Sequence, residues 1–277
     1  MVYIKSETEI AALRQGGRLL ARILDDLIKA IKPGIGTAEL EKQAEEKMAA
    51  IDGHPAFKGY DMGDDIFFPS ILCISINDEV VHGSALPDRI LKAGDIVDID
   101  LGMEWPTRAA DRSQFGWPAN PHSAHGGYFT DMCATVAVGK VSREAKKLLK
   151  VTKDCLLAGI KLAKPGNSLN MIGSAIQKIA EAHGYGVVRD LVGHGVGYFA
   201  HEDPNVFNYE IGERARENLI LKPGMVIAIE PMINLGSHRV KIAPNRFTVL
   251  TADHSLSAHF EHTVAITKSG HQVLTEL

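Results

Sequence analysis

Four acidic residues lie at the ends of apolar segments that read as strands of a protein core. They are Asp100 after Ile96–Ile99, Asp131 before an apolar run, Glu230 after Val226–Ile229, and Glu261 before His262–Val264. Acidic side chains are rarely fully buried unless they are paired or bind a metal. Any one of the four is explained as a solvated strand end. Their chemistry therefore depends on whether they come together.

An internal repeat predicts that they do. Leu91–Asp100 resembles Leu221–Glu230 at an offset of 130 residues. Farther on, Phe129–Val138 resembles Phe260–Ile266, with a difference of two residues that a β-bulge would absorb. Solenoid units are shorter, roughly 20–50 residues. The repeat predicts one domain, 1–277, made of two related α/β halves at roughly 1–140 and 141–277.

The same alignment predicts a metal centre between the halves. It superimposes Asp100 on Glu230 and Asp131 on Glu261, so that two equivalent carboxylate pairs face each other. Four carboxylates in one place repel each other unless cations neutralise them. Oxygen-rich sites suit hard or borderline divalent metals, which can be held in pairs about 3.5–4 Å apart. A centre with two divalent ions is the simplest interpretation.

Three histidines lie in settings that favour exposure to a cavity. His194 stands among three glycines in Gly193–Gly197, a segment whose backbone is free to turn. His201 follows seven residues later, and His82 precedes Gly83. A lone histidine is more often a hydrogen-bonded structural residue than a ligand, and His194 is the best ligand candidate of the three.

The sequence lacks the motifs of several other enzyme classes. There is no G-x-x-x-x-G-K-[ST], no G-x-S-x-G and no H-E-x-x-H, and Gly193–Gly197 lacks the spacing of a dinucleotide-binding loop. Cys73 lies inside the apolar run Ile71–Ile74, which indicates a buried, inert thiol.

Helix and strand signals occur in the same order in each half. Ser6 and Glu9 form a capping box that starts a helix ending at Lys32-Pro33-Gly34. The other predicted elements are a helix at 37–50, strands at 71–76 and 96–101 with Asp78-Glu79 in a turn, a helix from about Ser142 to the stop at 164–166, and a helix at 168–183 followed by strands.

The stretch 105–127 interrupts this order. It is rich in Pro, Gly, Ser and His and has no hydrophobic period, so it is predicted to be a long loop that borders the site or is partly disordered. Its His122 and His125 have the chemistry to bind a metal, but histidines in a solvated loop rarely do.

Composition and charge narrow the possible functions and locations further. The chain has 277 residues, 45% of them apolar, and a net charge of −4 without charge blocks, which argues against nucleic acid or a membrane surface as partner. No apolar run approaches the roughly 18 residues of a membrane span, and the first residues, MVYIKSETEI, lack a targeting pattern. Three widely spaced cysteines fit a reducing compartment. We expect a cytoplasmic protein.

Taken together, these motifs resemble those of the type I methionine aminopeptidases of metallopeptidase family M24, over nearly the whole chain. The resemblance implies an α+β pita-bread (creatinase/aminopeptidase) fold, with a mostly antiparallel sheet and the helices outside. The matching motifs are Cys73–Asn77, Val80–Gly83, Asp95–Asp100, Gly193–Gly197, Ile229–Met232 and Ser255–Thr263.

The resemblance also implies a metal-ligand set. The ligands of two divalent ions (Co, Mn, Fe or Zn) would be Asp100, Asp131, His194, Glu230 and Glu261. Asp131 and Glu261 would bridge both ions, Asp100 would bind one, and His194 with Glu230 would complete the other.

Catalysis follows from the same resemblance. A metal-activated water would attack the first peptide bond of nascent chains at the ribosome, with a small second residue preferred. His82 and His201 would contact the substrate and the tetrahedral intermediate, and Glu230 would pass a proton to the leaving amine. The methionine pocket would be formed by Tyr60, Phe68, Cys73 and Phe247. Members of this short form are usually monomers.

Departures from the family pattern keep two alternatives open. Phe247 stands where tryptophan is common, Ala200 stands where a larger aromatic is usual, and 30 residues separate Asp100 from Asp131 where a short hairpin is typical. Thr130-Asp131-Met132 is similar to the Xaa-Pro peptidases of the same fold. The second alternative, from another class, is a noncatalytic pita-bread binding module.

Overall fold

A computed structural model describes residues 1–277. The helices are α1 (Glu7–Ala30), α2 (Thr37–Ala50), α3 (Ala109–Phe115), α4 (Arg143–Leu162) and α5 (Leu169–Ala182). The strands are β1 (His54–Pro55), β2 (Cys73–Ile76), β3 (Glu79–Val81), β4 (Ile96–Trp105), β5 (Tyr128–Ala137), β6 (Gly186–Val187), β7 (Gly193–Gly195), β8 (Glu202–Val206), β9 (Val226–Ile229), β10 (Met232–Asn234), β11 (Val240–Ile242), β12 (Val249–Thr251), β13 (Ser257–His259), β14 (His262–Thr267) and β15 (Gly270–Val273).

Local signals determine where the long helices begin. The predicted capping box at α1 is present: Ser6 accepts from the backbone of Glu9, and the Glu9 side chain accepts from the backbone of Ser6. Ser142 caps α4 in a similar way through the backbone N–H of Ala145. The predicted helices at 37–50 and 168–183 correspond to α2 and α5, and no helix is long and apolar enough to cross a membrane.

All strand pairs are antiparallel. The largest sheets have the orders β1-β4-β2, with β5 also paired to β4, and β15-β14-β9-β7-β8. The strand predicted at 96–101 continues to Trp105, because all ten residues of β4 pair with β5. The strand predicted at 71–76 is shorter and begins at Cys73, and Glu79 already belongs to β3.

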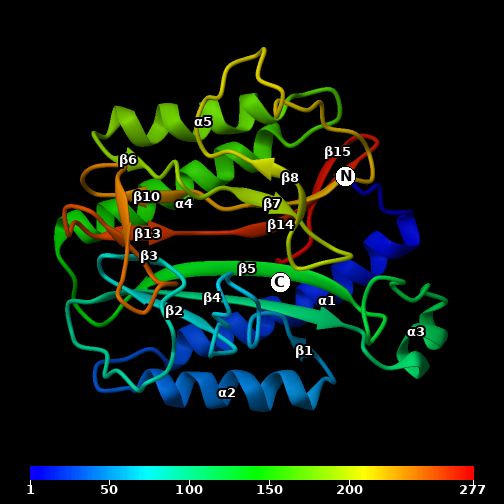
Figure 1. The fold of residues 1–277 in the computed structure, drawn as a ribbon, viewed down its shortest axis with the longest axis horizontal. Coiled ribbons are helices and arrows are strands. Elements are labelled where there is room, and N and C mark those ends of the chain that lie inside the picture. Colours follow the sequence, from blue (N-terminus) through cyan, green and yellow to red (C-terminus); the bar gives the residue numbers. More distant parts are fainter.

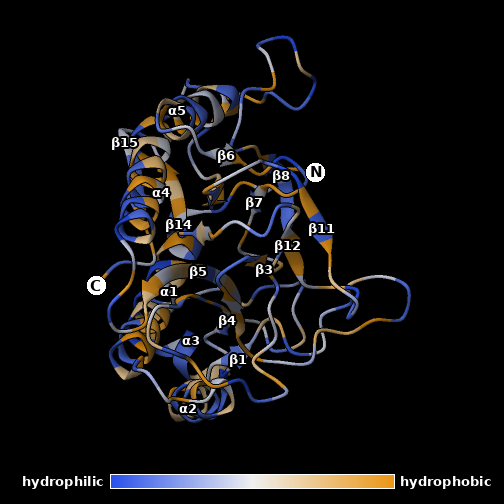
Figure 2. Cartoon of the chain, turned by 90° about the vertical axis from the view of Figure 1, so that its left-hand side faces the viewer, coloured by the Kyte–Doolittle hydropathy of each residue, from blue (hydrophilic) through white to orange (hydrophobic).

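The long helices cover one side of the strands. In Figure 2, α5, α4, α1 and α2 lie along one side of the molecule, with β3, β11 and β12 on the other. Figure 1 shows α4 and α5 above the strands and α2 below them. One large apolar cluster packs against α4 and α5 and another against α1 and α2. The α+β architecture, antiparallel sheets and outer helices are as predicted. The division into halves at 140/141 stays a prediction.

The prediction for 105–127 was partly wrong. The segment contains α3, a seven-residue helix that ends at Gly116, whose φ of 67° is the left-handed conformation that glycine favours. No residue of α3 is buried, so the sequence carries no apolar stripe that would have revealed it.

Candidate metal centre

The four carboxylates lie together where two pairs of strands meet. Asp100 is on β4 and Asp131 on β5, and these strands are paired with each other. Glu230 follows β9 and Glu261 precedes β14, which are also paired. The backbone N–H of Glu261 donates to the carbonyl oxygen of Cys133 on β5, 3.2 Å away, and joins the two pairs. Asp100, Asp131 and Glu261 are buried.

Donor atoms of the five predicted ligands gather into two overlapping groups. In one, oxygens of Asp100, Asp131 and Glu261 lie within 4.8 Å of one another. In the other, Glu261 lies within the same distance of Glu230 and His194 donors. Because Glu261 belongs to both groups, the arrangement suits two adjacent cations that share a ligand.

His194 presents one ring nitrogen to this cluster. Its Nδ1 lies 2.8 Å from the carbonyl oxygen of Gly195, a contact that requires a proton on Nδ1. The Nε2 lone pair then faces Glu230, whose Oε1 is 3.4 Å away. Glycine is needed on both sides of His194 because of close packing, rather than the predicted freedom of the backbone to turn. A Cβ at Gly193 or Gly195 would lie 2.5 Å or 2.2 Å from a backbone carbonyl oxygen of a neighbouring strand.

His82 and His201 both face the cavity that contains the carboxylates. The His201 ring lies 4.4 Å from the ring of His194 and 4.9 Å from that of Tyr60. Burial lowers the pKa of His82 and lowers that of His201 well below its usual value, which favours neutral imidazoles. His82 has a φ of 59°, a strained conformation of the kind found at functional sites.

Apolar side chains line the same cavity beside the carboxylates. Of the four predicted pocket residues, Tyr60, Phe68 and Cys73 line it. Phe247 does not; it packs edge to face against Phe68, with ring centroids 5.5 Å apart. The sequence did not single out six further apolar lining residues: Phe57, Met62, Val81, Leu191, Val192 and Met232.

Asp98 and His259 form a buried polar pair beside Glu230 that was not predicted from the sequence. His259 Nδ1 lies 3.3 Å from Asp98 Oδ2, and its Nε2 lies 3.5 Å from Glu230 Oε2. Burial lowers the pKa of His259, but Asp98 and Glu230 outweigh it and raise that pKa well above its usual value. The sequence does contain a signal for Asp98: residues two apart on a strand lie on the same face, so Asp98 shares a face with Asp100. We infer that His259 orients Glu230.

Comparisons with known proteins agree with this geometry. The family model described as metallopeptidase family M24 matches residues 11–121 and 122–268. The chain belongs to this family. A methionine aminopeptidase of Clostridium acetobutylicum is 42% identical over 275 residues, covering 99% of both chains. The crystal structure of methionine aminopeptidase from Thermotoga maritima superimposes with a TM-score of 0.87 at 35% identity, covering 100% of both.

Other branches of family M24 share the fold at lower similarity. Prolidase from Pyrococcus furiosus has a TM-score of 0.69 at 24% identity, covering 99% of this chain and 65% of that one. This likeness supports the pita-bread fold alone.

M24 proteins are metallopeptidases, and the donor set fits a divalent metal. Three buried carboxylate oxygens have no hydrogen-bond donor: Asp100 Oδ1, Asp131 Oδ1 and Glu261 Oε1. Burial raises the pKa of Asp100 and of Glu261 well above the usual range, and the charge of Asp131 raises both further. Cations beside these oxygens would supply both the missing partners and the missing charge.

The stability of the metal-free protein should therefore depend on Asp131. Burial raises its pKa from 3.8 to about 6, so between these values the folded state binds more protons than the unfolded state. The stability that Asp131 contributes below pH 4 is then lost as the pH rises towards 6. Because Asn cannot ionise, the free energy of unfolding of Asp131→Asn, measured with urea in chelator, should rise relative to that of wild type between pH 4 and 6. The rise should be at most about 1.4 kcal/mol per pH unit, the value for one full proton.

Asp253→Asn is the matched control. A hydrogen bond from the backbone N–H of Ser237 holds the pKa of Asp253 at about 2, so this carboxylate stays ionised throughout the interval. Its difference from wild type should change by only about 0.3 kcal/mol between pH 4 and 6, because Asp253 of the unfolded chain is largely ionised above pH 4. An equally small change for Asp131→Asn would contradict the account of the buried carboxylates.

Proposed function

We propose that this chain is a metallo-aminopeptidase that removes the N-terminal methionine from nascent proteins and peptides, with a small second residue preferred. The observation that carries the proposal is the cluster of Asp100, Asp131, His194, Glu230 and Glu261 beside an apolar cavity. Full-length similarity to methionine aminopeptidases supports the substrate class.

The five clustered residues are proposed as ligands of two divalent ions. Asp131 and Glu261 would bridge, Asp100 would bind one ion, and His194 Nε2 with Glu230 would bind the other. Carboxylate and imidazole donors accept Mn, Fe, Co or Zn, and supply in the cell decides among them. Bound ions would provide an activated water and polarise the scissile carbonyl.

The remaining polar residues would handle protons and charge. Neutral His201 would donate a hydrogen bond to the developing oxyanion, and His82 would contact the peptide. Glu230 would take a proton from the nucleophilic water and pass it to the leaving amine, a role that needs a carboxylate in hydrogen-bond reach. His259 would hold Glu230 in place for both purposes, because its Nε2 is 3.5 Å from Glu230 Oε2.

The apolar walls suit a methionine side chain. Tyr60, Phe68, Cys73 and Met232 give aromatic and sulfur-containing contacts on one side of the carboxylates. Phe247 would act indirectly, by supporting Phe68. We further propose that residues 1–277 form one catalytic domain that acts as a monomer in the cytoplasm, where nascent N-termini leave the ribosome.

A second candidate is an Xaa-Pro peptidase, which Thr130-Asp131-Met132 favours. Purified protein loaded with Mn or Co should release methionine from Met-Ala-Ser, less from Met-Leu-Ser, and no alanine from Ala-Pro-Ala. Alanine release alone would favour the Xaa-Pro candidate. No release from any peptide would overturn both and favour a noncatalytic binding module.

A further inference from the structure

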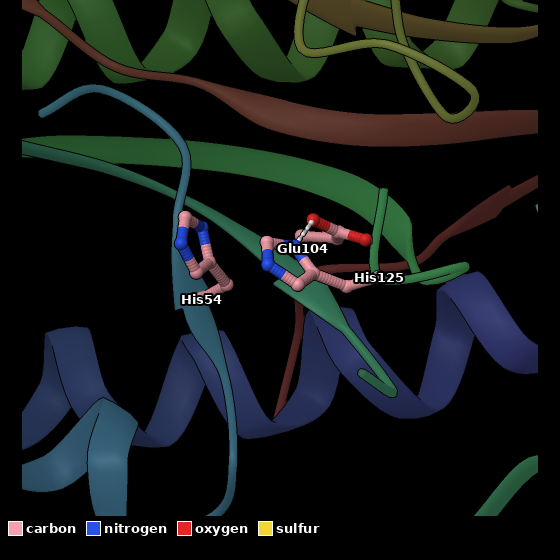
Figure 3. Close-up of side chains that lie close together, drawn as sticks. All are labelled: His54, Glu104 and His125. Carbon is pink, nitrogen blue, oxygen red and sulfur yellow. Dashed lines mark hydrogen bonds and ion pairs between the residues drawn. The ribbon is translucent and has the colours of Figure 1, made fainter. Parts of the chain in front are cut away.

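A second cluster of metal-binding side chains lies outside the catalytic cavity, at the base of the 105–127 segment. Figure 3 shows His54 from β1, Glu104 from β4 and His125 from residues 105–127, called the insertion below, pointing toward one another. One donor atom from each lies within 4.8 Å of the other two. We propose that His54, Glu104 and His125 bind a zinc ion that fastens the insertion to the sheet.

Strand register places the first two ligands. His54 is directly opposite Glu104 in the antiparallel pair β1–β4, so their side chains leave the same face of the sheet. The third ligand arrives from the end of the insertion, where Gly127 donates its backbone N–H to Glu104 Oε1 at 2.9 Å. Three chain segments thus bring nitrogen, nitrogen and oxygen donors to one point.

Glu104 is a buried carboxylate that forms no ion pair with a lysine or arginine. Its side chain is 3% exposed, and its partners are the hydroxyl of Ser123, the N–H of Gly127 and the His125 ring. Burying a carboxylate is costly unless a cation or several donors compensate. Oε2 contacts only His125 Nδ1, at 3.0 Å, and so keeps a lone pair for an ion.

His54 distinguishes a metal site from a hydrogen-bonded anchor. Its imidazole has no hydrogen-bond partner within the protein, yet its ring centroid is 4.3 Å from that of His125 with the planes tilted by 32°. The hydrogen bonds of Glu104 with His125 and Gly127 already hold the insertion, and His54 takes no part in them. Two imidazoles and a carboxylate are, however, a common zinc donor set.

Small side-chain rotations would complete the coordination. Zinc–nitrogen distances of about 2.0–2.1 Å place tetrahedral ligand atoms roughly 3.3 Å apart, and Oε2 and Nδ1 are already 3.0 Å apart. Both histidines are exposed, so their rings have room to rotate. The fourth position would open into a cavity lined by Lys58, Phe199 and His201. Because His201 also lines the catalytic cavity, the ion would fix the insertion beside the active site.

Zinc counting with single variants tests the proposal. After equilibrium dialysis against buffered zinc, His54→Ala should hold one zinc per chain fewer than wild type. In chelator the two proteins should unfold alike, because His54 is exposed. His122→Ala is the matched control, an exposed histidine of the same insertion outside the cluster. It should hold as much zinc as wild type.

Anomalous diffraction at the zinc edge locates the ion. Wild-type and His122→Ala crystals should show a peak between the three side chains, and His54→Ala crystals should show none there, with the catalytic peaks unchanged. Equal zinc contents in wild type and His54→Ala, or peaks at the catalytic centre alone, would overturn the proposal and leave Glu104–His125 as a hydrogen-bonded anchor.

Discussion

Glu261→Gln is expected to reduce methionine release more than about 100-fold at saturating metal. Loss of an outer partner of a metal ligand typically costs 10–100-fold, and Glu261 is proposed to bind both ions directly. Glutamine keeps the shape but removes the charge that attracts cations. The measurement is kcat/KM on Met-Ala-Ser together with metal content by elemental analysis.

The same variant should gain stability in chelator. The raised pKa of Glu261 means that the metal-free folded protein must either protonate this carboxyl or bury its charge beside Asp131. Glutamine avoids both costs, so the midpoint of thermal unfolding should rise while activity falls. Glu276→Gln, an exposed acidic residue near the C-terminus, is the control and should change neither property. Full activity of Glu261→Gln with normal metal content would contradict the proposed ligand set.

Lys5→Ala is expected to lower the free energy of unfolding by about 3–5 kcal/mol, because it leaves a buried charge unpaired. Lys5 Nζ lies 2.6 Å from Glu202 Oε2, and both side chains are 1% exposed. Glu202 also accepts a hydrogen bond from the backbone N–H of Tyr198 and follows His201 in the chain. The lost ion pair should therefore loosen the segment that carries His201 and lower kcat as well. Urea unfolding and steady-state kinetics measure the two effects.

Two further variants separate the ion pair from general damage. Lys5→Met with Glu202→Gln removes both charges and should recover most of the lost stability. Lys268→Ala breaks an exposed pair with Glu7, whose side chains are 83% and 85% exposed, and should be neutral. If Lys5→Ala is as stable as Lys268→Ala, the buried pair does not hold this part of the protein together.

The sequence predicted the carboxylate cluster because an internal repeat carries long-range information. Aligning Asp100 with Glu230 relates strands that are 130 residues apart, and a period of two then determines which face of each strand bears the acid. Capping residues similarly revealed the starts of α1 and α4. In each case the signal is either local or repeated.

Contacts between unrelated segments left no such signal. The Lys5–Glu202 pair joins residues 197 positions apart, and nothing around either residue indicates the other. The cluster of His54, Glu104 and His125 depends on strand register and on the path of the insertion. The contact of Phe247 with Phe68 depends on side-chain packing between two loops. These features arise only when segments far apart in the sequence pack against each other.

The most direct test of the account is metal-dependent methionine release. The protein should be stripped with chelator, reloaded with Mn or Co, and assayed on Met-Ala-Ser beside His194→Ala treated in the same way. We predict no release by the stripped protein, restored release after reloading, and none from His194→Ala under either condition. Equal release before and after reloading, or full release by His194→Ala, would contradict a metal centre built on these residues.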